Sequence, residues 1–209
     1  MASLPEVYLA RHGETAWTIT GQHTGRTDIR LTARGEHNAL SLCLRLQGAT
    51  FTRVLVSPLT RARRTCELAG FGGQAEIDPD LLEWDYGQYE GRRTADIRQE
   101  RPGWELFRDG CPGGESVEVV GARADRVMAR LRAVEGNVLV FSHGHFLRVL
   151  AARWLDLPAG DARHFVLSTA ALSILGYEHT RDEPAMRLWN DARHVVEAHR
   201  APMEARGNL

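Results

Sequence analysis

The chain has 209 residues, of which 43% are hydrophobic and 25% charged, a composition typical of a globular domain. A formal net charge of -1 at pH 7 excludes a strongly basic surface for nucleic acid and a polybasic surface for membranes. All 26 basic residues are arginine, so Schiff-base chemistry on lysine and a Walker-type phosphate loop are excluded as well. An anion bound by this protein is therefore held by arginine, histidine or backbone N–H groups.

The three cysteines, Cys43, Cys66 and Cys111, are odd in number and widely spaced. This pattern argues against a disulfide framework, and we expect Cys43 and Cys66 to be buried as small apolar residues. No apolar run approaches the roughly 20 residues of a membrane span, and the N-terminal residues lack the pattern of a secretory signal. We therefore expect a cytoplasmic protein, and a homodimer is left open.

Strands and helices alternate along the chain, which predicts an α/β fold: a three-layer α/β/α sandwich with a mainly parallel sheet. The expected strands are residues 6–10, 53–56, 138–141, 170–177 and 186–189. The expected helices open at 31–32, 57–58, 117 and 146. We expect one domain over residues 1–209, with a polar tail from about 195.

Two helix starts and one insertion stand out in this pattern. Thr32 is expected to cap the first helix, and Ser57 is expected to cap the second with Pro58 at its first position. Residues 71–114 are turn-rich but contain several aromatic side chains. We interpret them as a lid-like insertion because an ordinary linker would not be aromatic.

Three expected strands end in polar turns. The first ends at Arg11-His12-Gly13, the second is followed by Arg61 in the next helix, and the third ends at His143-Gly144. Ligands of open α/β sheets bind outside the carboxyl ends of the strands. We therefore expect these turns to converge on a site with two imidazoles, two guanidinium groups and helix N-termini, which suits a tetrahedral dianion.

The residues Leu9-Ala10-Arg11-His12-Gly13-Glu14-Thr15 resemble the signature of the histidine phosphatase superfamily, the phosphoglycerate-mutase-like proteins. Further segments resemble its other motifs in the same order: Thr24-Gly25, Leu31-Thr32, Ser57 to Ala62, Leu82-Glu83 with Gly87 to Gly91, Gly114-Glu115-Ser116 and Ser142-His143-Gly144. Within the superfamily, the chain looks most similar to acid-phosphatase and sedoheptulose-bisphosphatase-like members.

The resemblance implies a role for each matching residue. His12 would attack phosphorus and become a phosphohistidine, and Glu83 would protonate the leaving oxygen and later deprotonate water. The phosphoryl oxygens would be bound by Arg11, Arg61, His143 and the N–H of Gly144. Weaker candidates for contact with the substrate are Gln22, Thr24, Gly25 and Tyr86. No metal or other cofactor is implied.

The favoured function is a metal-independent phosphatase of small phosphorylated metabolites such as sugar phosphates or bisphosphates. A phosphoglycerate mutase is the first alternative, although Thr18 stands where mutases have an asparagine. A non-catalytic phospholigand-binding protein is the second alternative. His143-x-His145 could also be a metal-binding pair, since alternate residues of a strand share a face.

Four arginines of the insertion have two open interpretations. Arg92, Arg93, Arg98 and Arg108 either hold the second phosphate of a bisphosphate or lie free in solvent, and the sequence favours the solvated state for Arg92 and Arg93.

Overall fold

The computed structural model describes residues 4–195, and the expected polar tail lies largely outside them. Its centre is a sheet of six strands in the order β3-β2-β4-β1-β5-β6. The strands are β1 (Val7–Arg11), β2 (Arg53–Val56), β3 (Ala75–Ile77), β4 (Val138–Ser142), β5 (Leu172–Tyr177) and β6 (Pro184–Asp191). β3, β2, β4 and β1 are parallel, whereas β5 and β6 add an antiparallel edge.

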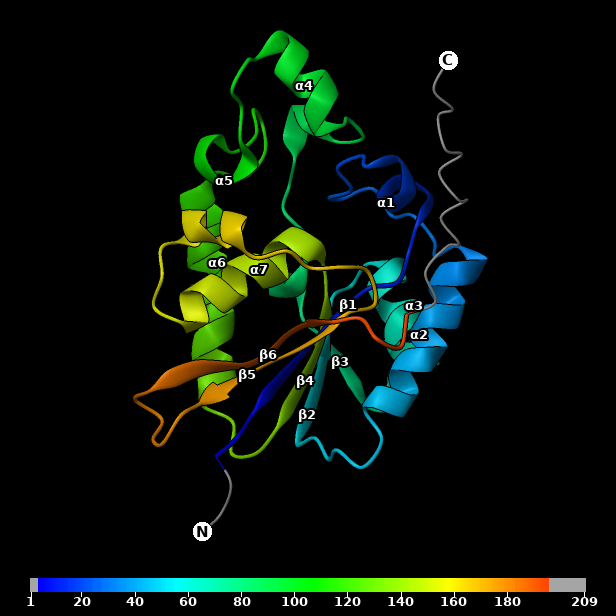
Figure 1. Ribbon diagram of the computed structural model, residues 1–209, viewed down its shortest axis with the longest axis vertical. Helices are drawn as coiled ribbons and strands as arrows, with labels where there is room; N and C mark the ends of the chain where they lie inside the picture. Colours follow the sequence, from blue (N-terminus) through cyan, green and yellow to red (C-terminus); the bar gives the residue numbers. More distant parts are fainter. Residues whose placement is uncertain (1–3, 196–209) are drawn as a thin grey trace, which may run out of the picture.

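Helices cover both faces of this sheet, as the alternation of strands and helices predicts. The helices are α1 (Ala16–Thr20), α2 (Ala33–Arg45), α3 (Thr60–Leu68), α4 (Thr94–Glu100), α5 (Leu106–Asp109), α6 (Val117–Arg132) and α7 (Gly144–Trp154). Short 3-10 turns lie at Gly72–Gln74, Pro79–Leu81, Gly87–Tyr89 and Ala159–His164. Figure 1 shows α6 and α7 on one side of the sheet, α2 and α3 on the other, and α4 and α5 above one end. The α/β/α sandwich is confirmed.

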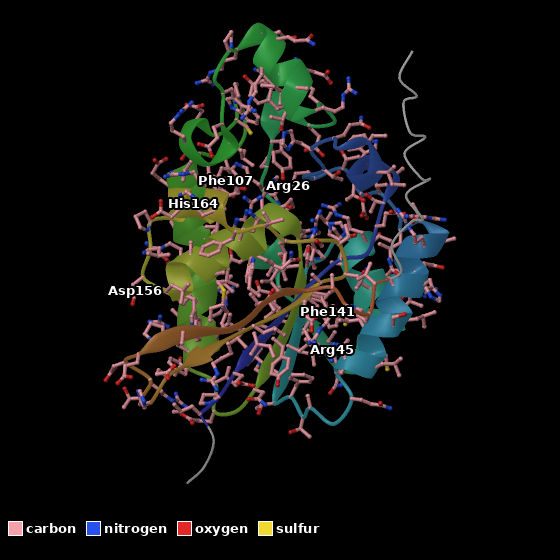
Figure 2. The ribbon with its side chains drawn as sticks, in the orientation of Figure 1. Arg26, Arg45, Phe107, Phe141, Asp156 and His164 are labelled. Atoms are coloured by element: carbon pink, nitrogen blue, oxygen red, sulfur yellow. The ribbon has the colours of Figure 1, made fainter. Side chains whose placement is uncertain are left out.

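Two separate cores follow from the alternation of side chains along the buried strands. Leu9 and Val140 face α6 and α7, whereas Ala10 and Phe141 face α2 and α3. Figure 2 labels Phe141 in the second of these layers. Because both faces are apolar, the polar groups that follow each strand are gathered at the strand ends.

The start of α3 differs from the expectation. The helix begins at Thr60 with Leu59 as its N-cap, not at Pro58 with a Ser57 cap. Asp28 lies close by and accepts hydrogen bonds from the Thr60 N–H (2.9 Å) and hydroxyl (2.6 Å). A carboxylate from 32 residues earlier therefore caps this helix, and the Ser57 hydroxyl is engaged elsewhere.

Thr32 caps α2 as expected, and its hydroxyl accepts from the N–H of Gly35. Cys66 is buried as expected, but Cys43 is exposed. Cys43 points outward because the buried positions of α2 are Gly35, Asn38, Ala39 and Leu42.

The insertion is more regular than the sequence predicts. Residues 75–77 are not part of a lid but form β3, which pairs in parallel with β2 at the edge of the sheet. This strand has no alternating pattern because Glu76 and Ile77 are both exposed. The segment that follows, residues 78–114, contains α4 and α5 and is called the cap segment below.

Candidate active site

The three expected turns converge at one end of the sheet. In the parallel pair of β1 and β4, Arg11 lies opposite Ser142, so His12 and His143 follow adjacent strand ends. The two imidazole rings are 5.2 Å apart between centroids. Ser57 follows β2 and donates its N–H to Phe141, which brings the third turn to the same place. The topology thus gathers the polar residues as the motif positions predict.

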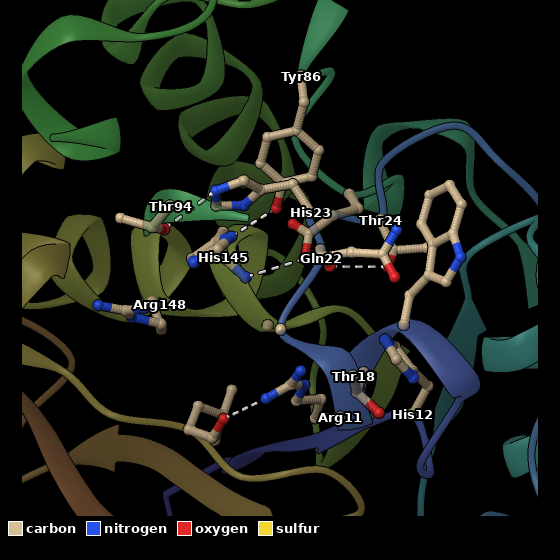
Figure 3. Close-up of a pocket in the computed structure, with 15 residues that line it drawn as sticks. Arg11, His12, Thr18, Gln22, His23, Thr24, Tyr86, Thr94, His145 and Arg148 are labelled. Atoms are coloured by element: carbon tan, nitrogen blue, oxygen red, sulfur yellow. Dashed lines mark hydrogen bonds between the residues drawn. The ribbon is translucent and has the colours of Figure 1, made fainter. Parts of the chain in front are cut away.

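A cavity of about 270 Å³ opens between these strand ends and the cap segment. Figure 3 shows Arg11, His12 and Thr18 on one side of it and Tyr86, His23 and His145 on the other. The lining residues are Arg11, His12, Trp17, Thr18, Gly21, Gln22, His23, Thr24, Glu83, Tyr86, Thr94, Gly144, His145, Arg148 and Leu167.

His12 presents one free nitrogen to this cavity. Its Nδ1 lies 2.7 Å from the carbonyl oxygen of Gly13, which can only accept, so Nδ1 carries the proton and Nε2 the lone pair. Burial, followed by the charges of Arg61 and Arg11, holds the pKa of His12 well below its usual value of 6.5. His12 is therefore a neutral imidazole at physiological pH, which is the nucleophilic form.

Arg11 is a cation prepared for an anion. One of its nitrogens donates to the carbonyl of Leu167, but its buried Nε has no partner among the described residues. Burial lowers the pKa of Arg11 from the usual value of an arginine. Gly144 is needed beside it, since a Cβ there would come within 3.1 Å of the guanidinium carbon. The unpaired nitrogen is the kind of donor that a phosphoryl oxygen satisfies.

Arg61 and His143 lie behind the cavity and not among its lining residues. Arg61 donates to the carbonyls of Thr24, Gly25 and Thr27, and its Nε donates to His143 Nδ1 at 3.1 Å. Because Nδ1 accepts, His143 carries its proton on Nε2, which contacts the hydroxyl of Ser57 at 2.7 Å. Both residues are fully buried. They therefore affect the cavity through the positive charge of Arg61 and through the residues that they contact.

Glu83 comes from the cap segment and is held against the N-terminus of α7. Its Oε1 accepts from the N–H groups of Trp84 and Phe146 at 2.9 Å, and its Oε2 accepts from that of His145 at 3.0 Å. These three N–H donors at the N-terminus of α7 fix the position of the carboxyl group beside the cavity. The N–H of Gly144 donates to no acceptor among the described residues, and Gly144 lines the cavity.

The weaker sequence candidates divide into two groups. Thr24 and Gln22 line the cavity, but the Gln22 amide donates to the Gly91 carbonyl at 2.7 Å. Gly25 does not line it, and its N–H donates to the carboxylate of Glu90. Thr18 lines the cavity, but its hydroxyl donates to the carbonyl of Thr15 in the cap of α1. These polar groups mainly hold the loop after β1 in place.

Tyr86 lines the cavity within an aromatic cluster that sequence reasoning did not find. Its hydroxyl is hydrogen-bonded to His145 Nδ1, and its ring lies 4.8 Å from that of His23. Burial, followed by the charge of Glu83, raises the pKa of Tyr86 well above 10. Burial also lowers the pKa of His145 well below 6.5 and that of His23 to about 4. The cluster is therefore uncharged at neutral pH.

Two further arginines were missed by sequence reasoning. Arg148 of α7 lines the cavity, and its signal in the sequence is its position four residues after the His143-Gly144 turn, on the first turns of a helix. Arg123 of α6 lies beneath the site and binds the backbone of the cap segment. No motif distinguishes it from the other arginines of α6.

The arginines of the cap segment lie outside the cavity. Arg92 pairs with Glu100, Arg93 with Asp96, and Arg108 with Asp109, each through two hydrogen bonds. Arg98 donates to the carbonyl of Trp104. Arg92, Arg93 and Arg108 are therefore paired with carboxylates away from the cavity, which argues against their holding a second phosphate.

A metal pair at His143 and His145 is not supported by the geometry. His143 is engaged by Arg61 and Ser57, whereas His145 Nδ1 is engaged by Tyr86. Within residues 4–195, no three His, Cys, Asp or Glu side chains are grouped closely enough to hold a metal ion.

The family model of the histidine phosphatase superfamily (branch 1) matches residues 7–192. The chain belongs to this superfamily. The acid phosphatase of Mycobacterium tuberculosis is 42% identical to this chain, and the match covers 82% of this chain and 86% of the relative. The sedoheptulose 1,7-bisphosphatase of Saccharomyces cerevisiae is 32% identical, with 88% and 92% covered. A Salmonella choleraesuis sequence named "Probable phosphoglycerate mutase GpmB" is 33% identical, with 84% and 86% covered.

Solved structures of histidine phosphatases have the same fold. The product of an open reading frame of Mycobacterium tuberculosis is 38% identical, with a TM-score of 0.84 and 89% of this chain and 97% of that chain covered. The α-ribazole phosphatase of Shigella flexneri is 30% identical, with a TM-score of 0.79 and 92% and 100% covered. This family membership makes the chain a phosphoric monoester hydrolase. None of the helices in residues 4–195 has the length and apolar character to cross a bilayer.

Proposed function

We propose that this histidine phosphatase hydrolyses small phosphorylated metabolites, most specifically sugar phosphates, through a phosphohistidine on His12. The observation that supports the nucleophile best is the lone pair on His12 Nε2, which is fixed by the Nδ1 contact to the Gly13 carbonyl and faces the cavity beside Arg11. The substrate class is supported by similarity to an acid phosphatase and to a sedoheptulose 1,7-bisphosphatase.

In the first step, His12 Nε2 forms a bond to phosphorus while the phosphorus–oxygen ester bond breaks. The leaving oxygen takes a proton from Glu83, because a sugar alkoxide is a poor leaving group. The proton that Glu83 passes on arrives with the monoanionic form of the substrate, since the second phosphate ionisation lies near pH 6. Arg11 and the N–H of Gly144 bind the phosphoryl oxygens, and Arg61 adds positive charge from behind, where the neutral His143 accepts a hydrogen bond from it.

In the second step, water attacks phosphorus and the phosphorus–nitrogen bond breaks. Glu83, now a carboxylate again, takes the proton of the water. His12 recovers its neutral form, and inorganic phosphate leaves. The three N–H groups that hold Glu83 keep the same carboxylate in place for both proton transfers.

No divalent metal takes part in this proposal, since Arg11 and Arg61 supply the positive charge that phosphoryl transfer requires. The proposal also includes a reducing, cytoplasmic location, which the free cysteines Cys43, Cys66 and Cys111 support. It extends to a homodimer, supported by Leu40 and Leu44 on the exposed side of α2. Sedimentation measurements test the oligomeric state.

The mutase alternative is supported by similarity to several relatives named probable phosphoglycerate mutase, each 33% identical to this chain. A mutase must protect its phosphohistidine from water while the bound product changes its orientation and receives the phosphoryl group. In this chain residue 18 is a threonine, which has no side-chain amide. Its hydroxyl donates to the carbonyl of Thr15 and not to the cavity. An assay that compares phosphoglycerate isomerisation with phosphate release from sugar phosphates separates the two activities.

The test of the nucleophile is to trap the phosphoenzyme with a labelled aryl phosphate in the presence of EDTA. We expect acid-labile, alkali-stable label on His12, and turnover that persists in the chelator. The His12→Ala variant should lose the label and at least about 10³-fold in kcat. Wild-type turnover by His12→Ala would overturn the nucleophile, and loss of activity in EDTA that a divalent ion restores would overturn the metal-independent mechanism.

A further inference from the structure

A second hollow of about 190 Å³ adjoins the active-site cavity under the cap segment. The two share His23, Thr94, His145 and Arg148 as lining residues, so they lie side by side at these four side chains. The second hollow adds Arg98, Trp104, Glu105, Leu106, Phe107 and Arg163. Figure 3 shows Arg148 and Thr94 on the side of the cavity away from His12.

Arg148 is a partly buried cation without a carboxylate partner. Its Nε donates to the Ala162 carbonyl at 3.1 Å and one terminal nitrogen donates to that of Arg163 at 3.2 Å. Its guanidinium lies 4.4 Å from the centre of the Phe107 ring. No described residue accepts from its other terminal nitrogen, and no described carboxylate lies within ion-pair distance. Burial lowers the pKa of Arg148 to about 10, so the group stays charged at neutral pH.

The charge of the second hollow is positive overall. Arg98 and Arg163 lie at its exposed rim, Arg98 without a described ion pair and Arg163 at 3.7 Å from Asp161. Glu105 is the one carboxylate among the lining residues, and His23 and His145 are neutral because burial lowers their pKa. Three guanidinium groups against one carboxylate favour an anion there.

We propose that Arg148, supported by Arg98 and Arg163, binds an anionic group at the far end of the leaving group. The substrate is then a phosphomonoester with a second phosphate or a carboxylate, separated from the reacting phosphoryl group by a polar chain or sugar. This inference rests on the proposed function, because it takes His12 as the place where phosphorus reacts. The inference assigns the second anionic group to Arg148 and not to Arg92, Arg93 and Arg108, because these three are paired with carboxylates outside the cavity.

The test uses unbranched diol bisphosphates of increasing length, each beside the diol monophosphate and the ω-carboxy monophosphate of equal length. We expect kcat/KM for the bisphosphate or the carboxylate to exceed that for the hydroxyl compound by about 10- to 100-fold at one best length. The carboxylate arm identifies which anion is preferred. Added salt should reduce this advantage, which a purely structural role of Arg148 would not predict.

The variants separate the charge of Arg148 from its packing. Arg148→Met keeps an apolar stem over Phe107 and should remove most of the advantage, whereas Arg148→Lys should retain part of it. Arg108→Met removes an arginine of the cap segment outside the cavity and should leave the ratio unchanged. An equal loss on the bisphosphate and the hydroxyl monophosphate in Arg148→Met, or a wild-type ratio near one at every length, would overturn the inference.

Calorimetry with His12→Ala makes this result independent of turnover. Tighter binding of the bisphosphate than of the monophosphate, lost in His12→Ala/Arg148→Met, supports the distal anion site even where no phosphate is released. A wild-type chain that releases no phosphate from p-nitrophenyl phosphate contradicts the proposed function instead. The two failures are therefore distinguishable.

Discussion

At the scale of single residues, the two imidazoles beside the cavity differ in chemistry although both are buried and neutral. His143 has both ring nitrogens engaged, by Arg61 and by Ser57. His12 has only Nδ1 engaged and keeps the lone pair of Nε2. The hydrogen-bond partners, and not the residue type, therefore assign nucleophilic attack to His12 and a supporting role to His143.

Glu83→Gln should reduce turnover of sugar phosphates by about 10²–10⁴-fold, the usual contribution of a general acid. The same change should cost an activated aryl phosphate much less, since its leaving group scarcely needs a proton. Steady-state kinetics on both substrates measure the difference. The glutamine oxygen can still accept from the N–H groups of Trp84 and Phe146, whereas its NH2 group faces the N–H of His145, so the contact to His145 is lost for both substrates alike.

Asp85 serves as the matched control, because it is the other acidic side chain near this turn. Its carboxylate accepts from the N–H of Gly87 at 2.9 Å and lies 3.5 Å from Arg26, and it does not line the cavity. Asp85→Asn should therefore leave the ratio of the two substrates unchanged. Equal losses on both substrates in Glu83→Gln, with a changed ratio in Asp85→Asn, would transfer the role to Asp85.

The residues of the site that could be predicted from the sequence are those that lie inside the sequence motifs. His12, Glu83 and Gly144 belong to such motifs, and all three line the cavity. Arg148 and His23 could not be found in this way. Arg148 has only its spacing from the His143-Gly144 turn as a signal, and the place of both side chains at the cavity depends on how the cap segment folds back over α7, which is a tertiary contact.

At the scale of elements, α6 holds the part of the cap segment that contains Glu83. Arg123 donates to the carbonyls of Asp80 (2.9 Å), Leu82 (2.6 Å) and Glu83 (3.3 Å). The same guanidinium pairs with Glu115 through two hydrogen bonds, and Glu115 accepts from the N–H of Asp85 at 2.8 Å. One buried arginine thus fixes both ends of the turn around Glu83.

Arg123→Met should destabilise the protein by about 3–5 kcal/mol, because it leaves Glu115 as an uncompensated buried charge and frees several carbonyls. Urea unfolding measures this loss. Arg126→Met is the control on the same helix, since Arg126 is exposed and pairs with Asp80 at the surface. It should cost less than about 1 kcal/mol. Similar losses in the two variants would contradict the role of Arg123.

The elements that could be predicted from the sequence are those whose side chains repeat with a clear period, as in α6 and β4. β3 and the start of α3 could not be predicted from the sequence. β3 is a three-residue edge strand whose partner, β2, supplies the reason for its conformation. The cap of α3 comes from Asp28, so its start depends on a contact between distant segments.

At the scale of the whole molecule, the site concentrates imidazoles that burial keeps neutral. The pKa values of His12, His143 and His145 lie well below 6.5, and that of His23 lies near 4. In the unfolded chain all four return to about 6.5. Between these values the unfolded state binds more protons than the folded state, so the free energy of unfolding falls as the pH falls.

Stability should therefore decline from about pH 7 downward, before the carboxylates titrate. Each neutral histidine contributes a slope of about 1.4 kcal/mol per pH unit once the pH is well below 6.5. For His23 alone, the interval from 6.5 to about 4 amounts to about 3 kcal/mol. His12, His143 and His145 add to this loss in the same direction, because burial lowers the pKa of each. Urea unfolding at half-unit steps between pH 7.5 and 5 measures the slope.

His23→Asn tests the origin of this slope, because it removes one of the four groups without touching the phosphoryl-binding residues. The variant loses the contact between His23 Nε2 and the Thr94 hydroxyl, so its stability at pH 7.5 will be lower. Its dependence on pH should nevertheless be shallower, by about a quarter of the wild-type slope when all four groups contribute equally. A wild-type stability that stays flat from pH 7.5 to 5.5 would mean that the cavity admits protons to these imidazoles. His12 would then be cationic in mild acid, and the nucleophile would be lost over the same pH range.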